Sequence, residues 1–374
     1  MRVLHLYSGN RYGGIESVLV TLARHRAQAP EMEPVFALAF EGRVAGELRN
    51  AGGEVHVVGP TRLSRPVSVW RTRRRLSALL AAGGFDVALA HAPWSMAVYG
   101  PAVRRHALPL AFWMHDAVGA GDRVERRARR VRPALALCNS AFTASTLPRI
   151  YPDVPAEVVH PPVPPPPAFD RARVRAQVHA ELSTAAEDVV VVQVGRMEAW
   201  KGHARLLAAL GSLRDVDGWT AWIVGGAQRT EEAAYVEELR RTAAALGIAD
   251  RIRFTGERAD VARVLAAADV ACQPNASPEP FGVAIVEALY ASLPVVATAS
   301  GGALEIVTPE CGALVPPDDV AALSGSLRRL FVDVDERNRL AAAGPARACA
   351  VADVGATMRK LAHALAAISR KAEA

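Results

Sequence analysis

The chain has 374 residues, 51% of them hydrophobic and 22% charged, which leaves room for two apolar cores and excludes a disordered protein. No run of about 18 uncharged apolar residues occurs, so we expect no membrane-spanning helix. The formal net charge of +6 is uneven: residues 1–167 carry 21 Lys and Arg against 12 Asp and Glu, and residues 168–374 carry 23 against 26. The basic excess is therefore confined to the first half.

The first half alternates short apolar strands with helical segments, which predicts a parallel, doubly wound α/β domain. A glycine-containing loop, Ser8–Gly14, separates the first strand from the first helix. The expected strands are Val3–Tyr7, Pro34–Ala39, Glu54–Val58, Val87–Ala90, Leu110–Met114 and Ala134–Cys138, and the expected helices are Ile15–Arg26, Val69–Ala82, Met96–Arg105, Arg123–Arg132 and Ser140–Ile150.

The proline-rich segment His160–Phe169 cannot continue a helix or a sheet, so it marks a domain boundary with a stiff hinge. We expect an N-terminal domain at 1–163, a C-terminal domain at 164–352 and a terminal helix at 353–374. The alternation resumes beyond the boundary. The expected strands are Val189–Gly195, Thr220–Val224, Ile252–Phe254, Val270–Gln273 and Val295–Ala297, and the expected helices are those from His203 and Pro280 and those at Thr230–Leu246, Val261–Ala268, Val320–Phe331 and Val354–Ala374.

The four cysteines have no CxxC spacing and no histidine partners, which favours reduced core thiols and a cytoplasmic location over a metal site or a disulfide framework. They are Cys138, Cys272, Cys311 and Cys349.

The stretch Ser277–Gly302 carries two glutamates, Glu279 and Glu287, eight residues apart. Pro280 suits the first turn of a helix, which predicts Glu279 at a loop-to-helix junction and Glu287 about two turns in. Carboxylates so spaced would bracket a ligand roughly 10–12 Å long, and the helix-start N–H groups of Phe281, Gly282 and Val283 would bind an anion. An ordinary capped helix with two solvent-facing glutamates has the same spacing.

A second cationic segment, Val194–Gly202, has Arg196 and Lys201 just after the carboxyl end of a strand, where open α/β sheets bind ligands. The chain is rich in arginine and has only two other lysines, Lys360 and Lys371, so Lys201 stands out. Two fixed cations would stabilise a departing diphosphate. A solvated surface loop is the alternative.

The sequence EPFGVAIVEAL followed by PVVATASGG resembles the Glu-x7-Glu motif and glycine segment of family-four retaining glycosyltransferases. The resemblance implies the GT-B fold, in which two doubly wound Rossmann-like domains face a central cleft and the last helix returns to the N-terminal domain. It also implies that Glu279 lies by the donor sugar, that Glu287 binds the ribose, and that Arg196 and Lys201 bind the diphosphate.

The same resemblance extends to residues whose local signals are weaker. Gly13 and Gly14 match the loop after the family's first strand, although GNRYGG is not a G-x-G-x-x-G fingerprint. His115 corresponds to a histidine against the donor sugar, although a lone histidine is more often structural. The segment with Arg253 and Phe254 matches the one whose backbone meets the nucleobase, and Gly302 is expected to contact phosphate.

The resemblance implies a metal-independent hexosyl transfer with retention, from a UDP- or GDP-linked sugar as co-substrate, to a glycan, lipid-linked or small-molecule acceptor. No resident cofactor is expected, because no metal-ligand cluster or covalent nucleophile stands out in the sequence. Two alternatives remain: a nucleotide-sugar epimerase or hydrolase on the same fold, and a non-catalytic protein that binds glycans or lipids.

Arginines gather in two segments of the basic half, Arg71–Arg75 and Arg123–Arg132. Solvated helix faces explain them. Contact with anionic lipid at the inner face of the membrane is the functional alternative, at about 1 kcal/mol per basic residue. Nucleic acid is disfavoured, since no aromatic residues are interleaved with the arginines.

Overall fold

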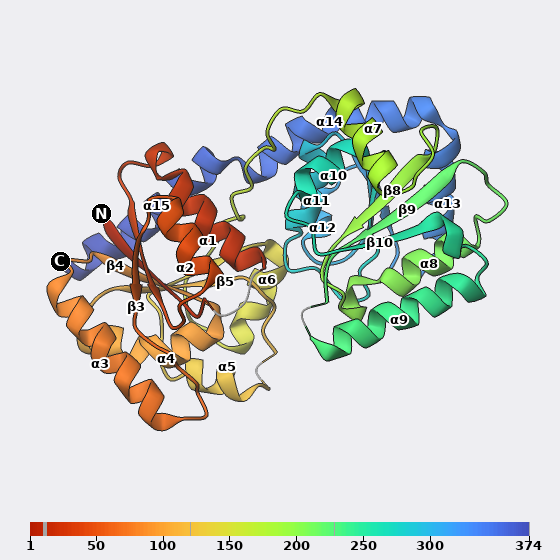
Figure 1. Cartoon of the computed structure of the whole chain (residues 1–374). Helices are drawn as coiled ribbons and strands as arrows, with labels where there is room; N and C mark the ends of the chain where they lie inside the picture. The colour runs from red at the N-terminus through yellow and green to blue at the C-terminus, as the bar shows by residue number, and fades with distance from the viewer. Residues whose placement is uncertain (10–12, 120, 228, 374) are drawn as a thin grey trace. The chain divides into compact units, whose positions relative to one another are not determined.

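The computed structural model describes residues 1–9, 13–119, 121–227 and 229–373. Contacts divide the chain into two compact units, residues 1–164 with 352–374 and residues 165–351 (Figure 1). Each unit is a parallel sheet covered by helices on its two faces, which confirms the predicted α/β class. Among the described residues, no helix is long and apolar enough to cross a membrane.

The first unit contains a seven-stranded parallel sheet with the order β3-β2-β1-β4-β5-β6-β7. The chain order reverses between β1 and β4, which is the topological switch point of this sheet. The strands are β1 Arg2–Tyr7, β2 Glu33–Leu38, β3 Glu54–Val57, β4 Val87–His91, β5 Leu110–Met114, β6 Leu135–Cys138 and β7 Ala156–Val158; the helices are α1 Gly14–Arg24, α2 Arg43–Asn50, α3 Pro66–Ala82, α4 Ala92–Arg105, α5 Arg123–Ala128, α6 Ala141–Thr146 and α15 Val354–Glu373.

The second unit contains a six-stranded parallel sheet with the order β10-β9-β8-β11-β12-β13, whose switch point lies between β8 and β11. The strands are β8 Val189–Val194, β9 Trp219–Val224, β10 Ile252–Gly256, β11 Val270–Gln273, β12 Val295–Thr298 and β13 Gly312–Val315; the helices are α7 Arg171–Glu181, α8 His203–Gly211, α9 Thr230–Ala245, α10 Val261–Ala267, α11 Val283–Tyr290, α12 Ala303–Ile306, α13 Val320–Val332 and α14 Val334–Ala352.

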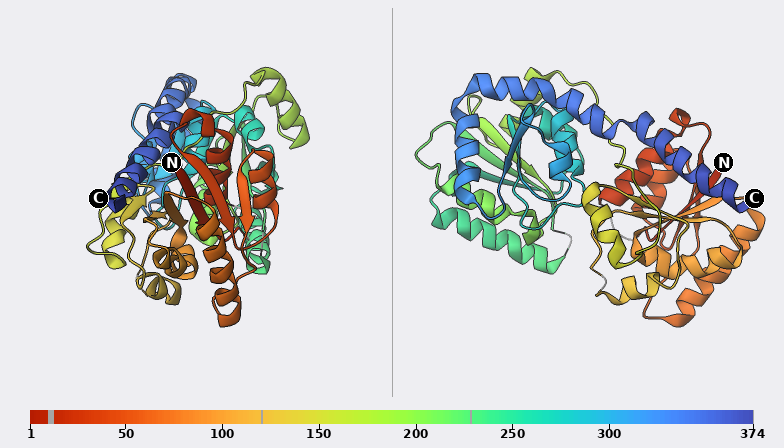
Figure 2. Two further views of the ribbon diagram at one scale, coloured as in Figure 1. Left: turned by 90° about the vertical axis from the view of Figure 1, so that its left-hand side faces the viewer. Right: turned by 180° about the vertical axis from the view of Figure 1, so that it is seen from behind.

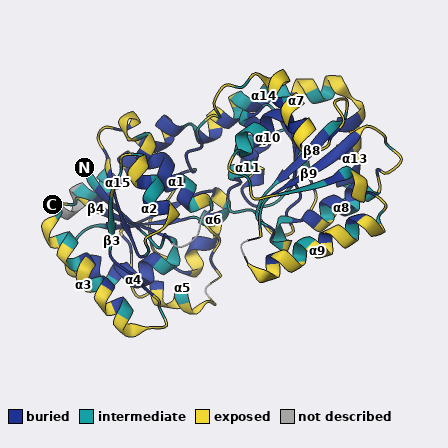
Figure 3. Ribbon diagram, in the orientation of Figure 1, coloured by how far each residue is buried: buried dark blue, intermediate teal, exposed yellow. Residues whose placement is uncertain are grey.

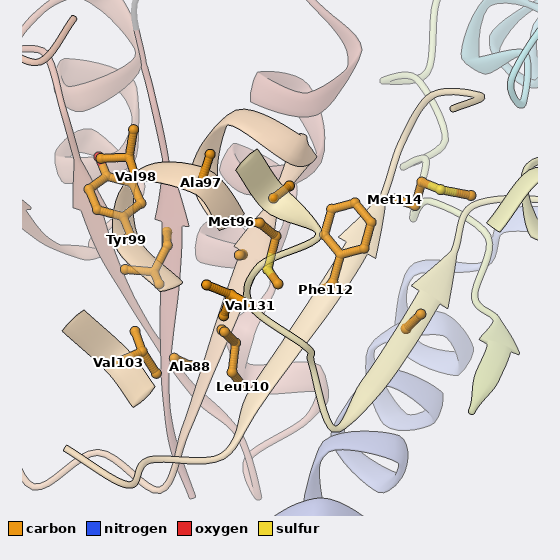
Figure 4. Close-up of a cluster of buried hydrophobic side chains, with 14 of the residues drawn as sticks. Ala88, Met96, Ala97, Val98, Tyr99, Val103, Leu110, Phe112, Met114 and Val131 are labelled. Atoms are coloured by element: carbon orange, nitrogen blue, oxygen red, sulfur yellow. The ribbon is translucent and has the colours of Figure 1, made fainter. Parts of the chain in front are cut away.

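Helices pack on both faces of the first sheet. On one face, Met96 and Val103 of α4 pack with Phe112 of β5 and Val131 in the cluster drawn in Figure 4. On the other face, the C-terminal helix α15 buries Met358 and neighbouring apolar residues against the sheet. Views from two further sides show α15 running along the first unit (Figure 2).

The core strands are buried along their length, whereas α3, α5 and α9 show exposed outer faces (Figure 3). This pattern follows from parallel sheets covered on both sides, whose strands are apolar throughout. Three cysteines are buried thiols, as predicted, but Cys349 is exposed. The prediction of a core position was wrong for Cys349, because it lies on an outward position of α14.

Candidate functional site

The loops after β8 and β11 meet at the switch point of the second sheet. The loop after β8 ends in a short 3-10 turn, Ala199–Lys201, closed by Gly202 in the left-handed conformation with φ 77°. A Cβ on Gly202 would lie 1.9 Å from the carbonyl oxygen of Pro274, so only glycine permits this close approach. The N–H of Ala276 donates to the carbonyl of Trp200 at 2.7 Å. The two loops are thereby held as one surface.

Lys201 and Glu279 form an ion pair on this surface. Lys201 Nζ donates to Glu279 Oε2 at 2.7 Å, and the two side chains are 15% and 16% exposed. The amide of Asn275 donates to the same carboxylate oxygen. The Lys201 ammonium also lies 4.0 Å from the centre of the Trp200 ring. The Lys201 ammonium lies at the carboxyl ends of the strands and is paired with one carboxylate, so it can also bind an anionic ligand.

Arg196 lies in the same loop and remains more open. Its guanidinium pairs with Glu198 Oε2 at 2.9 Å while 39% of its side chain is exposed. The indole N–H of Trp200 donates to the same oxygen of Glu198 at 2.9 Å. Glu198 therefore orients Arg196 without burying it, and the guanidinium keeps N–H donors that no described residue accepts from and that a ligand can use.

Helix α11 begins later than the sequence predicts. It starts at Val283, with Gly282 at φ 118° as the N-cap, so Pro280 and Phe281 lie outside it. The helical start at Pro280 was wrong, because the segment before Gly282 pairs with the chain at Gly301. Between the two glutamates only the residues from Val283 to Glu287 are helical, so the predicted separation of 10–12 Å between the two carboxylates does not follow from helix geometry.

The start of α11 nevertheless presents backbone donors. Among the described residues, the N–H groups of Val283 and Ala284 donate no hydrogen bond, whereas those of Ile285 and Val286 bond to Gly282. Phe281 precedes the cap and its side chain is 2% exposed, so it is a core residue. The donors that the helix offers are those of its own first turn.

Gly301 and Gly302 pack directly beneath this segment. A Cβ on Gly301 would lie 2.2 Å from the carbonyl oxygen of Glu279, and one on Gly302 would lie 2.3 Å from that of Phe281. The N–H of Gly302 donates to Glu279 O at 2.7 Å. The two glycines therefore hold the backbone of Glu279 in place.

Glu287 lies one turn inside α11 and is partly buried. Burial raises the pKa of its carboxyl to about 7. Its side chain has no hydrogen-bond partner within the described part of the chain. A carboxyl with a raised pKa can donate a hydrogen bond to a hydroxyl group when protonated and accept one when ionised.

Arg253 and Phe254 lie on β10, the edge strand of the second sheet. The guanidinium of Arg253 is bound by carbonyl oxygens, at 2.8 Å from Leu182 and 2.7 Å from Ser183. Phe254 lies under the guanidinium of Arg240, 4.7 Å from the ring centre. Neither side chain contacts the Lys201–Glu279 pair.

The glycine loop and His115 belong to the first unit. Gly13 caps α1 and Gly14 is its first residue, and a Cβ on Gly14 would meet nothing within 4 Å. Residues 10–12 of the predicted loop lie outside the described residues. His115 follows β5, and its Nε2 lies 2.9 Å from Nδ1 of His91. Burial lowers the pKa of His115 to about 3, so its ring is neutral at physiological pH.

Sequence reasoning missed a cavity at the switch point of the first sheet. It has a volume of about 500 Å³ and lies at the carboxyl ends of β1 and β4. Three aromatic side chains, two serines, one threonine and one arginine line it. Only Tyr7 among them lies on a strand, and the others lie in loops or on α4, so no strand or helix pattern marked them. These side chains are Tyr7, Phe40, Trp94, Ser8, Thr61, Ser95 and Arg62.

Family models match nearly the whole chain. The model described as Glycosyltransferase Family 4 matches residues 12–165, and the one described as Glycosyl transferases group 1 matches residues 174–347. A D-inositol 3-phosphate glycosyltransferase of Salinispora tropica is 33% identical over 299 residues, 71% of this chain and 61% of that protein. The lipopolysaccharide core biosynthesis glycosyltransferase LpsD of Rhizobium meliloti is 36% identical over 179 residues, 47% of this chain and 49% of its own length.

Solved structures share the fold across both units. Anabaena Alr3699/HepE in complex with UDP-glucose superposes with a TM-score of 0.83 at 24% identity, covering 98% of this chain and all of its own. A glycosyltransferase from Rickettsia africae gives a TM-score of 0.85 at 17% identity, covering 98% of each chain. The two parallel α/β units therefore form the GT-B fold.

Proposed function

The chain belongs to the family-four glycosyltransferases, and from this premise we propose that it transfers a hexosyl unit from a UDP- or GDP-linked sugar to an acceptor hydroxyl, with retention of configuration and without a metal ion. The single observation that supports this most is the Lys201–Glu279 pair, with Arg196 beside it, at the switch point of the second sheet.

The donor diphosphate binds to Arg196, Lys201 and the first turn of α11. Arg196 grips phosphate oxygens with its free donors, and Lys201 acts as a compact charge. As the bond from the sugar C1 to the phosphate oxygen breaks, negative charge grows on the diphosphate, and these fixed cations stabilise it without reorganising. The two cationic side chains thus supply the positive charge that a metal ion supplies in other diphosphate sites.

The carboxylates of Glu279 and Glu287 bind the uncharged parts of the donor, which are the sugar and the ribose. Glu279, held by Lys201 and Asn275, accepts from hydroxyls of the sugar. Glu287 binds the ribose hydroxyls, a role to which its raised pKa is suited. Phe254 and the backbone at Arg253 meet the nucleobase, and Gly302 lies by a phosphate.

The acceptor oxygen attacks C1 from the side that the diphosphate leaves. One C–O bond forms as the other breaks, and the acceptor proton passes to a phosphate oxygen of the leaving group. No carboxylate nucleophile is required, because the sugar never bonds to the protein. His115 of the first unit binds a sugar hydroxyl in this scheme, as the family resemblance implies.

The acceptor binds in the 500 Å³ cavity of the first unit. Aromatic walls from Phe40 and Trp94 suit the apolar faces of a sugar or cyclitol ring, and the hydroxyls suit its edges. Arg62 forms no ion pair among the described residues, so it favours an acceptor with a negative group. The similar Salinispora tropica protein is named for an inositol phosphate acceptor, which has this chemistry.

Product analysis tests the proposed function. We expect nucleotide release that requires an acceptor, a product with the anomeric configuration of the donor by NMR, and turnover that persists in EDTA. Release of nucleotide without an acceptor would identify a hydrolase instead. Binding of the nucleotide sugar without turnover would identify a non-catalytic protein.

We further propose that arginines of the first unit contact anionic lipid. Six of them line one cavity of about 710 Å³ among α3, α4 and α5, and none of the six forms an ion pair with a described residue. Trp70 and Val67, both 59% exposed, lie on the same helix α3. The six are Arg73, Arg74, Arg104, Arg105, Arg127 and Arg130.

Sedimentation with vesicles tests this contact. The Arg74→Glu/Arg105→Glu variant should lose binding to phosphatidylglycerol vesicles, while Arg241→Glu, an exposed position on α9, should bind as the parent does. Equal sedimentation of all three proteins, or binding to neutral phosphatidylcholine vesicles alone, would refute the proposal.

A further inference from the structure

Three histidines on neighbouring strands of the first sheet form a continuous hydrogen-bonded chain. His5 lies on β1, His91 ends β4 and His115 follows β5. His5 Nδ1 lies 3.0 Å from His91 Nε2, and His91 Nδ1 lies 2.9 Å from His115 Nε2. The ring planes differ by 19° and 17°, so the facing edges meet almost in plane. This row of three histidines runs from the sheet interior to the end of β5.

The inner end of this chain is closed and the outer end is open. His5 and His91 are 0% exposed, and Nε2 of His5 is buried and has no hydrogen-bond partner among the residues that the structure describes. Phe36 packs 5.2 Å from His5 and Trp113 packs 5.6 Å from His91, ring centre to ring centre, so aromatic walls surround the chain. His115 is partly exposed, and its Nδ1 makes no hydrogen bond with a described residue.

Burial keeps all three rings neutral. It lowers the pKa of His5 and of His115 to about 3, and it also lowers that of His91, with the neighbouring histidines adding to the effect. Each ring therefore carries one N–H at neutral pH. The two hydrogen bonds between the rings use two of the three N–H groups. The third N–H lies at one end of the row and is not used between the rings.

Only two proton arrangements satisfy both links. In the first, every ring carries its proton on Nδ1, so His5 donates to His91, His91 donates to His115, and Nδ1–H of His115 points outward. In the second, every ring carries its proton on Nε2, and the chain donates in the opposite direction. A change at one ring requires the same change at the other two, because each link needs one donor and one acceptor.

The closed end at His5 distinguishes the two arrangements. The second would bury an N–H of His5 with no acceptor, and orphaned buried N–H groups are rare in native proteins. The first leaves only a bare ring nitrogen there, and buried acceptors without partners are tolerated more often than donors.

We propose that His5 and His91 are positioning residues that hold His115 as its Nδ1–H tautomer, so that the open nitrogen of His115 donates a hydrogen bond to the ligand. A donor at this position suits a sugar hydroxyl or ring oxygen and excludes His115 as a general base. The assignment of the ligand rests on the proposed function, whereas the tautomer does not.

Nitrogen NMR of the full chain with ¹⁵N-labelled histidine tests the tautomer directly. Protonated and bare nitrogens of a neutral ring give well-separated signals, and a His115→Gln variant identifies those of His115. We expect a protonated Nδ1 in the parent protein and a mixture of tautomers in His91→Leu. A protonated Nε2 on His115, or the same spectrum in His91→Leu, would overturn the proposal.

The kinetics of His91 and His115 variants test whether the tautomer of His115 affects the rate of glycosyl transfer. His91→Leu should lower kcat by roughly three- to tenfold, the range of one hydrogen bond, with unchanged UDP affinity. His91→Asn keeps an amide donor near the Nδ1 position and should recover most of the loss. The double variant His91→Leu/His115→Ala should be no slower than His115→Ala alone.

A matched control separates positioning from general destabilisation. His179→Leu removes a buried histidine of the second unit and should lower the melting temperature without changing kcat per folded molecule. Additive losses in the His91/His115 double variant would contradict action through His115. If His115→Ala has full activity, the proposed role of His115 fails, while the NMR result on the tautomer still stands.

Discussion

The two switch points have the same topology and opposite chemistry. In the second sheet the loops after β8 and β11 bring together a lysine, a glutamate and an amide, with Arg196 alongside. In the first sheet β1, β4 and the residue after β5 carry neutral histidines, and the carboxyl ends of β1 and β4 line an aromatic-walled cavity. The comparison indicates that backbone topology selects where a ligand binds, and that the side chains on those loops select which ligand it is.

The largest expected effect comes from removing the cation of the charged switch point. Lys201→Ala should lower kcat by about two orders of magnitude or more, because charge on the leaving diphosphate loses a fixed partner. Steady-state assays with saturating donor measure it. Lys360→Ala, an exposed lysine on α15, is the control and should be unchanged. Near-normal turnover of Lys201→Ala would remove Lys201 from the chemistry.

The contact between the two loops can be broken at Gly202. Gly202→Ala adds a Cβ that meets the Pro274 carbonyl, in addition to the strain of a positive φ. Gly218→Ala has a similar φ of 69° with open space around it, so it carries the strain alone. Chemical unfolding should show Gly202→Ala less stable than Gly218→Ala by about 2 kcal/mol. Equal stabilities would mean that the loops are not tightly packed.

Glu287 is expected to govern nucleotide binding. Glu287→Ala should weaken UDP or GDP binding by about tenfold, the loss of a hydrogen bond to a charged or polar group. Calorimetry of the binding measures the dissociation constant. Glu305→Ala, which changes a carboxylate on the neighbouring helix α12, serves as a comparison. An unchanged constant for Glu287→Ala would remove it from the ribose.

The raised pKa of Glu287 also predicts a pH dependence of stability. The folded state holds the proton up to a pH of about 7, whereas the unfolded chain releases it near the ordinary value of 4.5. The folded state therefore binds more protons in that window, and its stability should fall as pH rises from 4.5 to 7. In urea unfolding measured between pH 4.5 and 7, Glu287→Gln should reduce the fall of the free energy of unfolding with pH. An unchanged pH dependence in this variant would mean that other groups cause it.

The smallest expected effect comes from the neutral switch point. Arg62→Ala should raise the acceptor KM by about fivefold, because one exposed charge contact is lost, and should leave the dissociation constant of the donor nucleotide unchanged. Arg65→Ala, on the same segment but outside the cavity, is the matched control. A changed donor affinity with an unchanged acceptor KM would move the acceptor away from this cavity.

Much of the fold was predictable because parallel strands buried on both faces leave continuous apolar runs. The strands at Leu110–Met114 and Val270–Gln273 agree with the structure to the residue. The helix α2 at Arg43–Asn50 and the helix α14 at Val334–Ala352 were not predicted, since their exposed faces interrupt the apolar pattern. The helix at Pro280 was misjudged, because a favourable proline does not outweigh the tertiary pairing at Gly301.

The sequence by itself determined the fold class and the family resemblance and predicted the roles of Lys201 and Glu279, because each depends on residue type and local spacing. Only the tertiary structure decided that Asn275 orients Glu279 and that Glu198 orients Arg196, that Trp94 and Arg62 line one cavity, and that His5, His91 and His115 form one hydrogen-bonded row. The three histidines are far apart in sequence and meet only because β1, β4 and β5 are neighbouring parallel strands of one sheet.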